Sequence, residues 1–373
     1  MEFKIKQEEL LKGLSRTQSI VEKKNTIKIL SNVLLKSSGS KLVIEATDLE
    51  VGISGSYKAE VISEGGITVD ARTLFEVVRQ IPEGTNIHCK KKENNWMELL
   101  AVRSVFNLVG LSVEDYPNIP SFEGEAQWKI DPDVLKGMID KTIFSVSHED
   151  MRYHLSGVYV ETVEEGSGLN LRMVATDGHR LSLADTPLEG NFPLSPGQGI
   201  IAPRKGMMEL RRVLDEGKET VGMKLEESNL MVKRDDLSLV MRLVDGTFPD
   251  YKQVIPKNND KKLIFSSREF AQTLRRVSVV SADRIKMVKF HITKDSVEVT
   301  SESPNMGTAK EEIKVDYTGA DMDVGFNANY MLDILNVVEE EKVEMILLDE
   351  SSPGEIHPLE DKNYYFIIMP MKI

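Results

Sequence analysis

Apolar and polar residues alternate over short stretches of the chain and then switch to a helical spacing at three places. These stretches lie at residues 3–5, 128–130 and 263–265. Further apolar residues follow five and nine positions after the last residue of each stretch, at Leu10 and Leu14, Leu135 and Ile139, and Phe270 and Leu274. Alternation is typical of a half-buried strand, and the wider spacing is typical of an amphipathic helix. Each stretch therefore predicts a strand that leads into a helix.

A second strand-to-helix pattern follows each of the first three, at residues 67–70, 200–202 and 324–327. Proline and serine at Pro132 and Ser266 supply helix start signals for two of the helices. In all, the pattern predicts six helices, at residues 7–24, 72–81, 133–147, 204–214, 267–284 and 328–341.

The repeated pattern predicts an α+β fold made of three copies of one unit, each with two helices backed by short antiparallel strands. We expect the domains at residues 1–124, 125–253 and 254–373. Three copies that curve consistently would close a ring if two chains joined head to tail, because heterologous contacts that close make rings. A repeat protein with no special ligand is the alternative.

Charge is distributed unevenly over these elements. The chain has a net charge of −13, which by itself argues against nucleic-acid binding because polyanions repel. The first five predicted helices nevertheless carry +1, +1, 0, +3 and +2, while the sixth, residues 328–341, is acidic. Either these are ordinary solvated helix faces, or they form a basic surface that faces phosphates while the strands and loops carry the acid.

Motifs for catalysis, metals or cofactors are missing from the sequence. It has no Gly-rich nucleotide loop, no zinc-protease helix and no hydrolase elbow, and Cys89 is the single cysteine. Asp177 and His179 suggest acid–base or metal chemistry, but Asp177-Gly178 favours a tight turn between two apolar runs. We expect no cofactor and no metal. Without an N-terminal apolar core or a long apolar run, a soluble, cytoplasmic protein is expected.

Several segments together resemble the bacterial sliding clamps, the beta subunit of DNA polymerase III. They are Thr47-Asp48-Leu49-Glu50, the stretch Met173 to Leu181, Pro203-Arg204-Lys205-Gly206, the stretch Leu243 to Tyr251, and the terminal Met369-Pro370-Met371-Lys372-Ile373. The resemblance covers the whole chain. It implies three clamp domains that form a ring as a head-to-tail homodimer, encircle double-stranded DNA without reading its sequence, and tether polymerase without catalytic activity.

The resemblance also implies three sets of functional residues. DNA-binding positions are Lys24, Tyr153, His154, Arg204 and Lys205, with Glu149 where some relatives have glutamine. A partner-peptide pocket is implied at Leu155, Thr176, Gly178, His179, Arg180, Leu181, Pro249, Val254, Pro353, Ile367, Ile368, Met369, Pro370 and Met371, beside Gln253, where some relatives have arginine. The dimer interface is implied at Phe106, Leu108, Val279 and Val280.

Partners follow from the same resemblance. They are a clamp loader that opens the ring, replicative and repair DNA polymerases, and other proteins that carry short linear peptide motifs, with no membrane. Two alternatives of other classes stay open at this point: a protein-interaction scaffold that does not encircle DNA, and an enzyme that uses Asp177 and His179.

Overall fold

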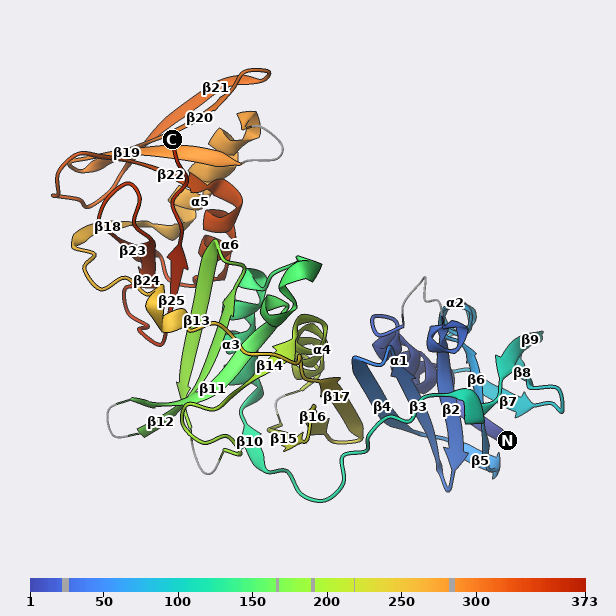
Figure 1. Cartoon of the computed structure of the whole chain (residues 1–373). Coiled ribbons are helices and arrows are strands. Elements are labelled where there is room, and N and C mark those ends of the chain that lie inside the picture. Colours follow the sequence, from blue (N-terminus) through green and yellow to red (C-terminus); the bar gives the residue numbers. More distant parts are fainter. Residues whose placement is uncertain (22–26, 166–167, 189–191, 218, 282–285) are drawn as a thin grey trace. The chain divides into compact units, whose positions relative to one another are not determined.

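A computed structural model describes residues 1–21, 27–165, 168–188, 192–217, 219–281 and 286–373 (Figure 1). It divides into two compact units. Unit 1 contains residues 1–132 and 208–243, and unit 2 contains residues 133–207 and 244–373. No helix in the described part of the chain is both long and apolar enough to cross a membrane.

Unit 1 is built on one large antiparallel sheet of thirteen strands, in the order β10-β15-β16-β17-β4-β3-β2-β6-β9-β8-β7-β1-β5. Its helices are α1 (Gln7–Thr17) and α2 (Ala71–Arg79). Its strands are β1 (Glu2–Lys6), β2 (Asn32–Ser38), β3 (Lys41–Thr47), β4 (Val51–Lys58), β5 (Glu60–Ser63), β6 (Gly65–Asp70), β7 (Asn86–Lys91), β8 (Trp96–Ala101), β9 (Ser104–Leu111), β10 (Trp128–Ile130), β15 (Val221–Glu226), β16 (Asn229–Arg234) and β17 (Leu237–Arg242).

Unit 2 contains an eight-stranded sheet, β14-β11-β12-β13-β25-β24-β23-β18, and a four-stranded sheet, β21-β20-β19-β22. Its helices are α3 (Pro132–Thr142), α5 (Ser267–Val277) and α6 (Ala328–Val337), while α4 (Arg204–Leu214) spans the division between the units. Its strands are β11 (Gly157–Glu165), β12 (Gly168–Thr176), β13 (Arg180–Pro187), β14 (Gly199–Pro203), β18 (Lys261–Ser266), β19 (Met287–Thr293), β20 (Ser296–Ser303), β21 (Gly307–Lys314), β22 (Met322–Asn327), β23 (Lys342–Leu347), β24 (Gly354–Pro358) and β25 (Tyr364–Ile368).

The predicted repeat is confirmed element by element. Strands β1, β10 and β18 lead into α1, α3 and α5, and strands β6, β14 and β22 lead into α2, α4 and α6. Polar side chains begin several of these helices, because the first backbone N–H groups have no partner within the helix. Ser266 accepts from the N–H of Glu269, Asp70 from that of Thr73 and Asn327 from that of Asn329.

The helix ends differ from the predicted ones. Helix α1 ends at Thr17 rather than at residue 24, and α6 ends at Val337 rather than at residue 341. Val338 adopts an extended backbone, which suits a β-branched residue. Glu340 lies beyond the helix, where its carboxylate accepts the backbone N–H groups of Glu360 and Asp361. The expectation of a strongly acidic sixth helix is therefore wrong, because α6 carries only Asp333.

Gly110 marks the point where β9 leaves β8 and joins β6. Its N–H donates to the carbonyl of Asn95, and it lies opposite Val69 of β6. A Cβ at this position would lie 2.6 Å from the carbonyl oxygens of both Asn95 and Thr68. Both contacts are with backbone oxygen atoms. A Cβ can therefore be accommodated only if the backbone of Asn95 and Thr68 shifts.

We expect Gly110→Ala to destabilise the chain by about 2 kcal/mol, the usual cost of overpacking. Gly137→Ala is the matched control, since a Cβ there meets no atom within 4 Å and lies within α3. Helix propensity predicts that it stabilises the chain by about 0.5–1 kcal/mol. Urea unfolding of the two variants measures both effects, and equal stabilities would contradict this account of Gly110.

Candidate functional site

The turn between β12 and β13 has the hydrogen bonds of a side-chain-stabilised turn. Thr176 Oγ1 donates to the carbonyl of Arg180 at 2.6 Å and accepts from the N–H of Gly178 at 3.1 Å. Asp177 Oδ1 accepts from the N–H groups of His179 and Arg180. Gly178 has a φ of +86°, which favours glycine. The predicted tight turn is confirmed, and the Asp177 carboxylate is used to build it.

Arg180 fixes this turn to its surroundings. Its side chain is buried, and its guanidinium donates to Asp177 at 3.1 Å, to Asp333 at 2.6 Å and to the carbonyl of Phe144 at 2.6 Å. It also lies over the ring of Tyr330, 4.4 Å from the centroid. Burial and the nearby Asp177 carboxylate raise the pKa of the Tyr330 hydroxyl. Arg180 was predicted as a pocket residue. In the structure, the N–H groups of its guanidinium bond to Asp177, Asp333 and Phe144 and so stabilise the turn.

The end of the chain lies directly beside this turn. Strand β25 pairs with β13, with Arg180 opposite Ile368 and Leu181 opposite Ile367, and the N–H of Met369 donates to the carbonyl of His179 at 2.9 Å. Met371 continues to Gly325 in β22, whose carbonyl accepts its N–H. Strand β25 also pairs with β24 on its other side, so it is an interior strand of its sheet, and the residues after it are held by further backbone hydrogen bonds.

One buried apolar cluster connects several of the predicted pocket residues. Leu155, Leu181 and Ile367 belong to it, together with Phe248 and Tyr251 from the segment after β17. The remaining members are Val174, Leu183 and Ile201. Residues far apart in the sequence are thus brought together.

Exposure divides the predicted pocket set into a surface layer and a buried layer. Gly178, His179, Pro249, Val254 and Met369 are exposed, with Val254 47% and Met369 38% accessible. The half-buried members are Thr176, Pro353, Pro370 and Met371, and the buried members are Leu155, Arg180, Leu181, Ile367 and Ile368. We call the exposed and half-buried residues the candidate peptide site.

A buried polar network supports the segment that carries Pro249 and Val254. Arg172 binds Asp185 through two hydrogen bonds of 2.7 and 2.6 Å and donates to the Tyr251 hydroxyl, which donates to Glu161. Burial raises the pKa of Tyr251, so the hydroxyl stays a donor. No spacing pattern in the sequence predicts this network, because its four members come from four separate segments.

Four of the five predicted DNA positions lie in two adjacent segments. Tyr153 and His154 belong to a short 3-10 helix at Asp150–Leu155, and Arg204 and Lys205 begin α4. The N–H of Arg204 donates to the carbonyl of Ser156, which joins the two segments. Tyr153 is 59% exposed, and its ring meets that of His154 edge to face. Lys24 lies outside the described residues.

Arg152 connects the segment of Tyr153 to the turn at Gly178. Its Nη1 donates to the carbonyl of Asp177 at 2.9 Å, and a Cβ on Gly178 would lie 2.8 Å from that nitrogen. Arg152 Nε also forms an ion pair with Glu149 at 3.3 Å. The carboxylate at Glu149 therefore lies beside a cation that offsets its charge.

Two of the predicted interface residues lie in β9. Phe106 and Leu108 are half-buried on one face of this strand, and the opposite face exposes Val105 and Val109, which are 57% and 61% accessible. The sequence interpretation did not include those two valines, although apolar residues at Val105, Phe106, Leu108 and Val109 occupy both faces of the strand. In the last third of the chain, Val279 is 65% exposed and Val280 is half-buried.

The Asp177–His179 pair has no geometry for acid–base chemistry. Both oxygens of Asp177 accept from the backbone or from Arg180, whereas the ring of His179 stacks against Tyr330 with 6.2 Å between centroids. The arrangement suits surface recognition by a ring and exposed apolar side chains.

Comparison with known proteins gives matches along the whole chain. Family models of the DNA polymerase III beta subunit match its N-terminal domain at residues 1–120, its central domain at 129–250 and its C-terminal domain at 252–372. The beta sliding clamp of Caulobacter vibrioides is 36% identical over 100% of both chains.

Solved structures match equally completely. A structure of the C. crescentus beta sliding clamp has a TM-score of 0.95 at 36% identity, covering 100% of this chain and 99% of that one. A structure of the DNA polymerase III beta subunit of Bartonella birtlesii bound to griselimycin has a TM-score of 0.93 at 32% identity, covering 100% of both chains.

Arg180→Ala should destabilise the β12–β13 hairpin by about 3 kcal/mol, because removing one partner of a buried ion pair leaves Asp177 uncompensated. Lys262→Ala is the control, since it removes an exposed pair with Glu344 and should cost less than about 1 kcal/mol. Hydrogen exchange of the β13 amides measures the local effect. Equal protection in the two variants would contradict a structural role for Arg180.

Proposed function

The chain belongs to the DNA polymerase III beta subunit family, and from that membership we propose how its domains close a ring, contact DNA and bind partner proteins. Proteins of this family are sliding clamps. As a sliding clamp, the chain is a processivity factor: it encircles duplex DNA, slides along it and tethers the replicative polymerase, and it catalyses no reaction itself.

The proposed domain boundaries are residues 1–124, 125–253 and 254–373. Ring closure joins the first domain of one copy to the third domain of the other. The observation that carries this proposal is a pair of matching strand edges. In the described chain, residues 104–109 of β9 pair only with β8, and β21 is the outer strand of its sheet. Their burial patterns are the same, position by position.

An unpaired strand edge offers a row of backbone donors and acceptors to another chain. We propose that β9 and β21 of two copies pair, with Phe106, Leu108, Val279 and Val280 packing beside them. Val105 and Val109 extend this apolar contact. The core of such an interface is apolar, as ring closure requires.

For DNA, we propose contacts through Tyr153, His154, Arg204 and Lys205, with Lys24 as a fifth. Cations near the start of α4 attract phosphates without reading bases, and water-mediated contacts let the ring slide. The ion pair between Glu149 and Arg152 supports this assignment, because it reduces the repulsion that an unpaired carboxylate would exert on phosphates.

For partners, we propose that the candidate peptide site binds short linear motifs of replicative and repair polymerases and of a clamp loader that opens the ring. Exposed Val254 and Met369 supply apolar contacts, and methionine adapts to related sequences. The solved B. birtlesii relative contains griselimycin, and we propose that griselimycin binds this chain at the candidate peptide site. A cytoplasmic location follows from a role in replication.

Topological retention tests the ring. Loader-assembled protein should stay on nicked circular DNA at high salt and leave when the circle is linearised, because salt weakens phosphate contacts but does not open a closed ring. Val279→Asp should abolish retention by placing a charge in the apolar interface, and its native mass should be that of one chain. A clamp that left circular and linear DNA equally fast would overturn the proposal.

Calorimetry with griselimycin tests the peptide site. Val254→Asp should weaken binding at least about tenfold, because it puts a charge against an apolar contact. Leu359→Asp is the matched control, an exposed leucine in the same third of the chain that is 37% accessible. Thermal stability should be equal in both variants. If Val254→Asp bound griselimycin with unchanged affinity, the candidate peptide site would not be where griselimycin binds.

A further inference from the structure

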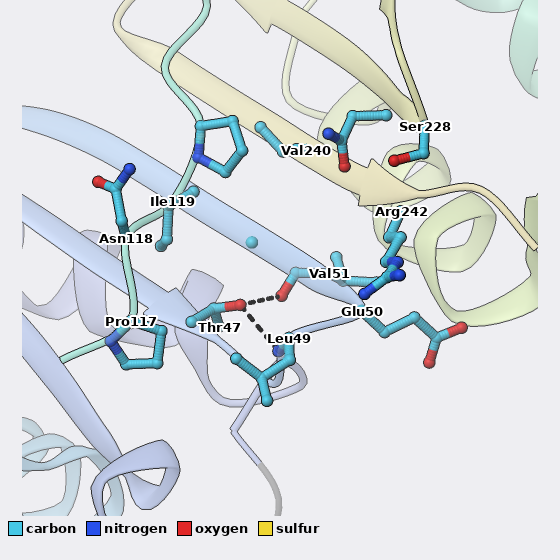
Figure 2. A pocket seen from close by; sticks show the side chains of 13 residues that line it. Thr47, Leu49, Glu50, Val51, Pro117, Asn118, Ile119, Ser228, Val240 and Arg242 are labelled. Atoms are coloured by element: carbon cyan, nitrogen blue, oxygen red, sulfur yellow. Dashed lines mark hydrogen bonds between the residues drawn. The ribbon is translucent and has the colours of Figure 1, made fainter.

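The turn at residues 47–51 repeats the hydrogen bonds of the turn at residues 176–180. Thr47 Oγ1 donates to the carbonyl of Val51 and accepts from the N–H of Leu49, both at 3.0 Å (Figure 2). Asp48 Oδ1 accepts from the N–H groups of Glu50 and Val51. The corresponding bonds of the second turn are those of Thr176 and Asp177 described above.

The strand that lies beside each turn is equivalent as well. Val51 lies opposite Met241 of β17, as Arg180 lies opposite Ile368 of β25. The N–H of Arg242 donates to the carbonyl of Glu50 at 2.8 Å, as that of Met369 donates to His179. The structure thus contains, within unit 1, a second copy of the backbone that carries the candidate peptide site.

A cavity of about 220 Å³ opens at this second copy (Figure 2). We call it the junction cavity. It is lined by Thr47, Leu49, Glu50, Val51, Gly52, Pro117, Asn118, Ile119, Pro120, Ser228, Asn229, Val240 and Arg242. Pockets for drug-sized ligands are larger, roughly 300–1,000 Å³. The volume suits one or two amino-acid side chains.

Ile119 gives the cavity a fixed apolar wall. It packs against the cluster of Ile29, Leu34 and Tyr116 and also against the cluster that includes Val240. A Cβ on Gly52 would lie 2.8 Å from Cγ2 of Ile119, so the glycine permits this close approach. An apolar side chain entering the cavity meets a wall that is already in place.

Hydrogen-bonding groups of two kinds remain available at the rim. Arg242 is exposed, and its guanidinium makes no hydrogen bond or ion pair with any residue that the structure describes. The backbone N–H groups of Asn118 and Ile119 likewise donate to no described residue. An extended chain offers the carbonyls that such N–H groups need, and a carboxylate complements a guanidinium.

We propose that the junction cavity binds an extended peptide segment of a partner protein, with one apolar side chain in the cavity and a neighbouring carboxylate on Arg242. The peptide class rests on the proposed function, because the shared backbone suggests it. The charge preference and the single-side-chain size rest on Arg242 and on the cavity itself.

Leu49 gives this site a side chain that the candidate peptide site lacks. It stands where Gly178 stands in the second turn, and it has a φ of +79°, an unusual backbone conformation for a leucine. Its side chain lines the cavity and is 52% exposed. The two sites therefore select different peptides.

Methyl NMR of the full-length protein tests the proposal with two capped tetrapeptides, acetyl-Ala-Asp-Leu-Ala-amide and its lysine counterpart, acetyl-Ala-Lys-Leu-Ala-amide. The acidic peptide should shift the methyl signals of Val51, Ile119 and Val240 in a saturable manner, and the lysine peptide should bind more weakly. Arg242→Glu should weaken the acidic peptide about fivefold or more and reverse the preference. Arg242→Gln should remove the preference without reversing it.

Lys58→Glu is the matched control, because it makes the same charge change at the far end of β4. It should leave both affinities unchanged. The proposal is overturned if no peptide shifts these methyl signals, if Arg242→Glu binds the acidic peptide as the original chain does, or if the signals move with protein concentration alone, which would make a second copy the occupant.

Signals of Leu155, Val254 and Ile367 separate this result from the proposed function. If griselimycin leaves them unchanged while the acidic tetrapeptide shifts Ile119, the candidate peptide site fails and the junction cavity stands. The reverse pattern overturns the junction cavity and leaves the candidate peptide site intact.

Discussion

Strand pairing between consecutive domains is the interaction on which both candidate sites depend. β17 of the central domain pairs with β4 of the first, and β25 of the third domain pairs with β13 of the central one. Each pairing fixes the register of a last strand against a turn, since a slip of one residue would turn every side chain to the opposite face. The turn, the following linker and the strand end therefore meet at both places.

The same backbone carries different chemistry at its two copies. At the second turn, Arg180 is buried and satisfied by two carboxylates and a carbonyl, so it stabilises the turn and leaves recognition to exposed His179, Val254 and Met369. At the first turn, the equivalent residue is Val51, and Arg242 on the neighbouring strand is a cation whose guanidinium bonds to no residue that the structure describes. Because the threonine and aspartate side chains of each turn and the backbone bonds to the neighbouring strand maintain the geometry, the other side chains are free to differ.

Much of the fold was predictable because it depends on local patterns. The six helix starts follow from periodicity and from caps such as Asp70 and Ser266, which act over three or four residues. The helix ends were less predictable: α6 stops at Val337 because β-branched backbone preference and the bonds of Glu340 to residues twenty positions away outweigh the apolar spacing. The cross-domain pairings and the network of Arg172 and Tyr251 join distant segments, and no local pattern encodes them.

The acidity of the chain and its role on DNA are compatible once charge is assigned to the observed helices. Helices α2, α4 and α5 carry +1, +3 and +2, α1 and α3 are neutral, and α6 carries −1. The single acid of α6, Asp333, is bound to Arg180, and Glu149 is bound to Arg152. The most basic helix, α4, begins beside Tyr153 and His154, so Arg204 and Lys205 place cationic charge at the proposed DNA contact. A weak, localised attraction of this kind suits sliding, because a uniformly basic ring would bind phosphates too strongly to move freely along them.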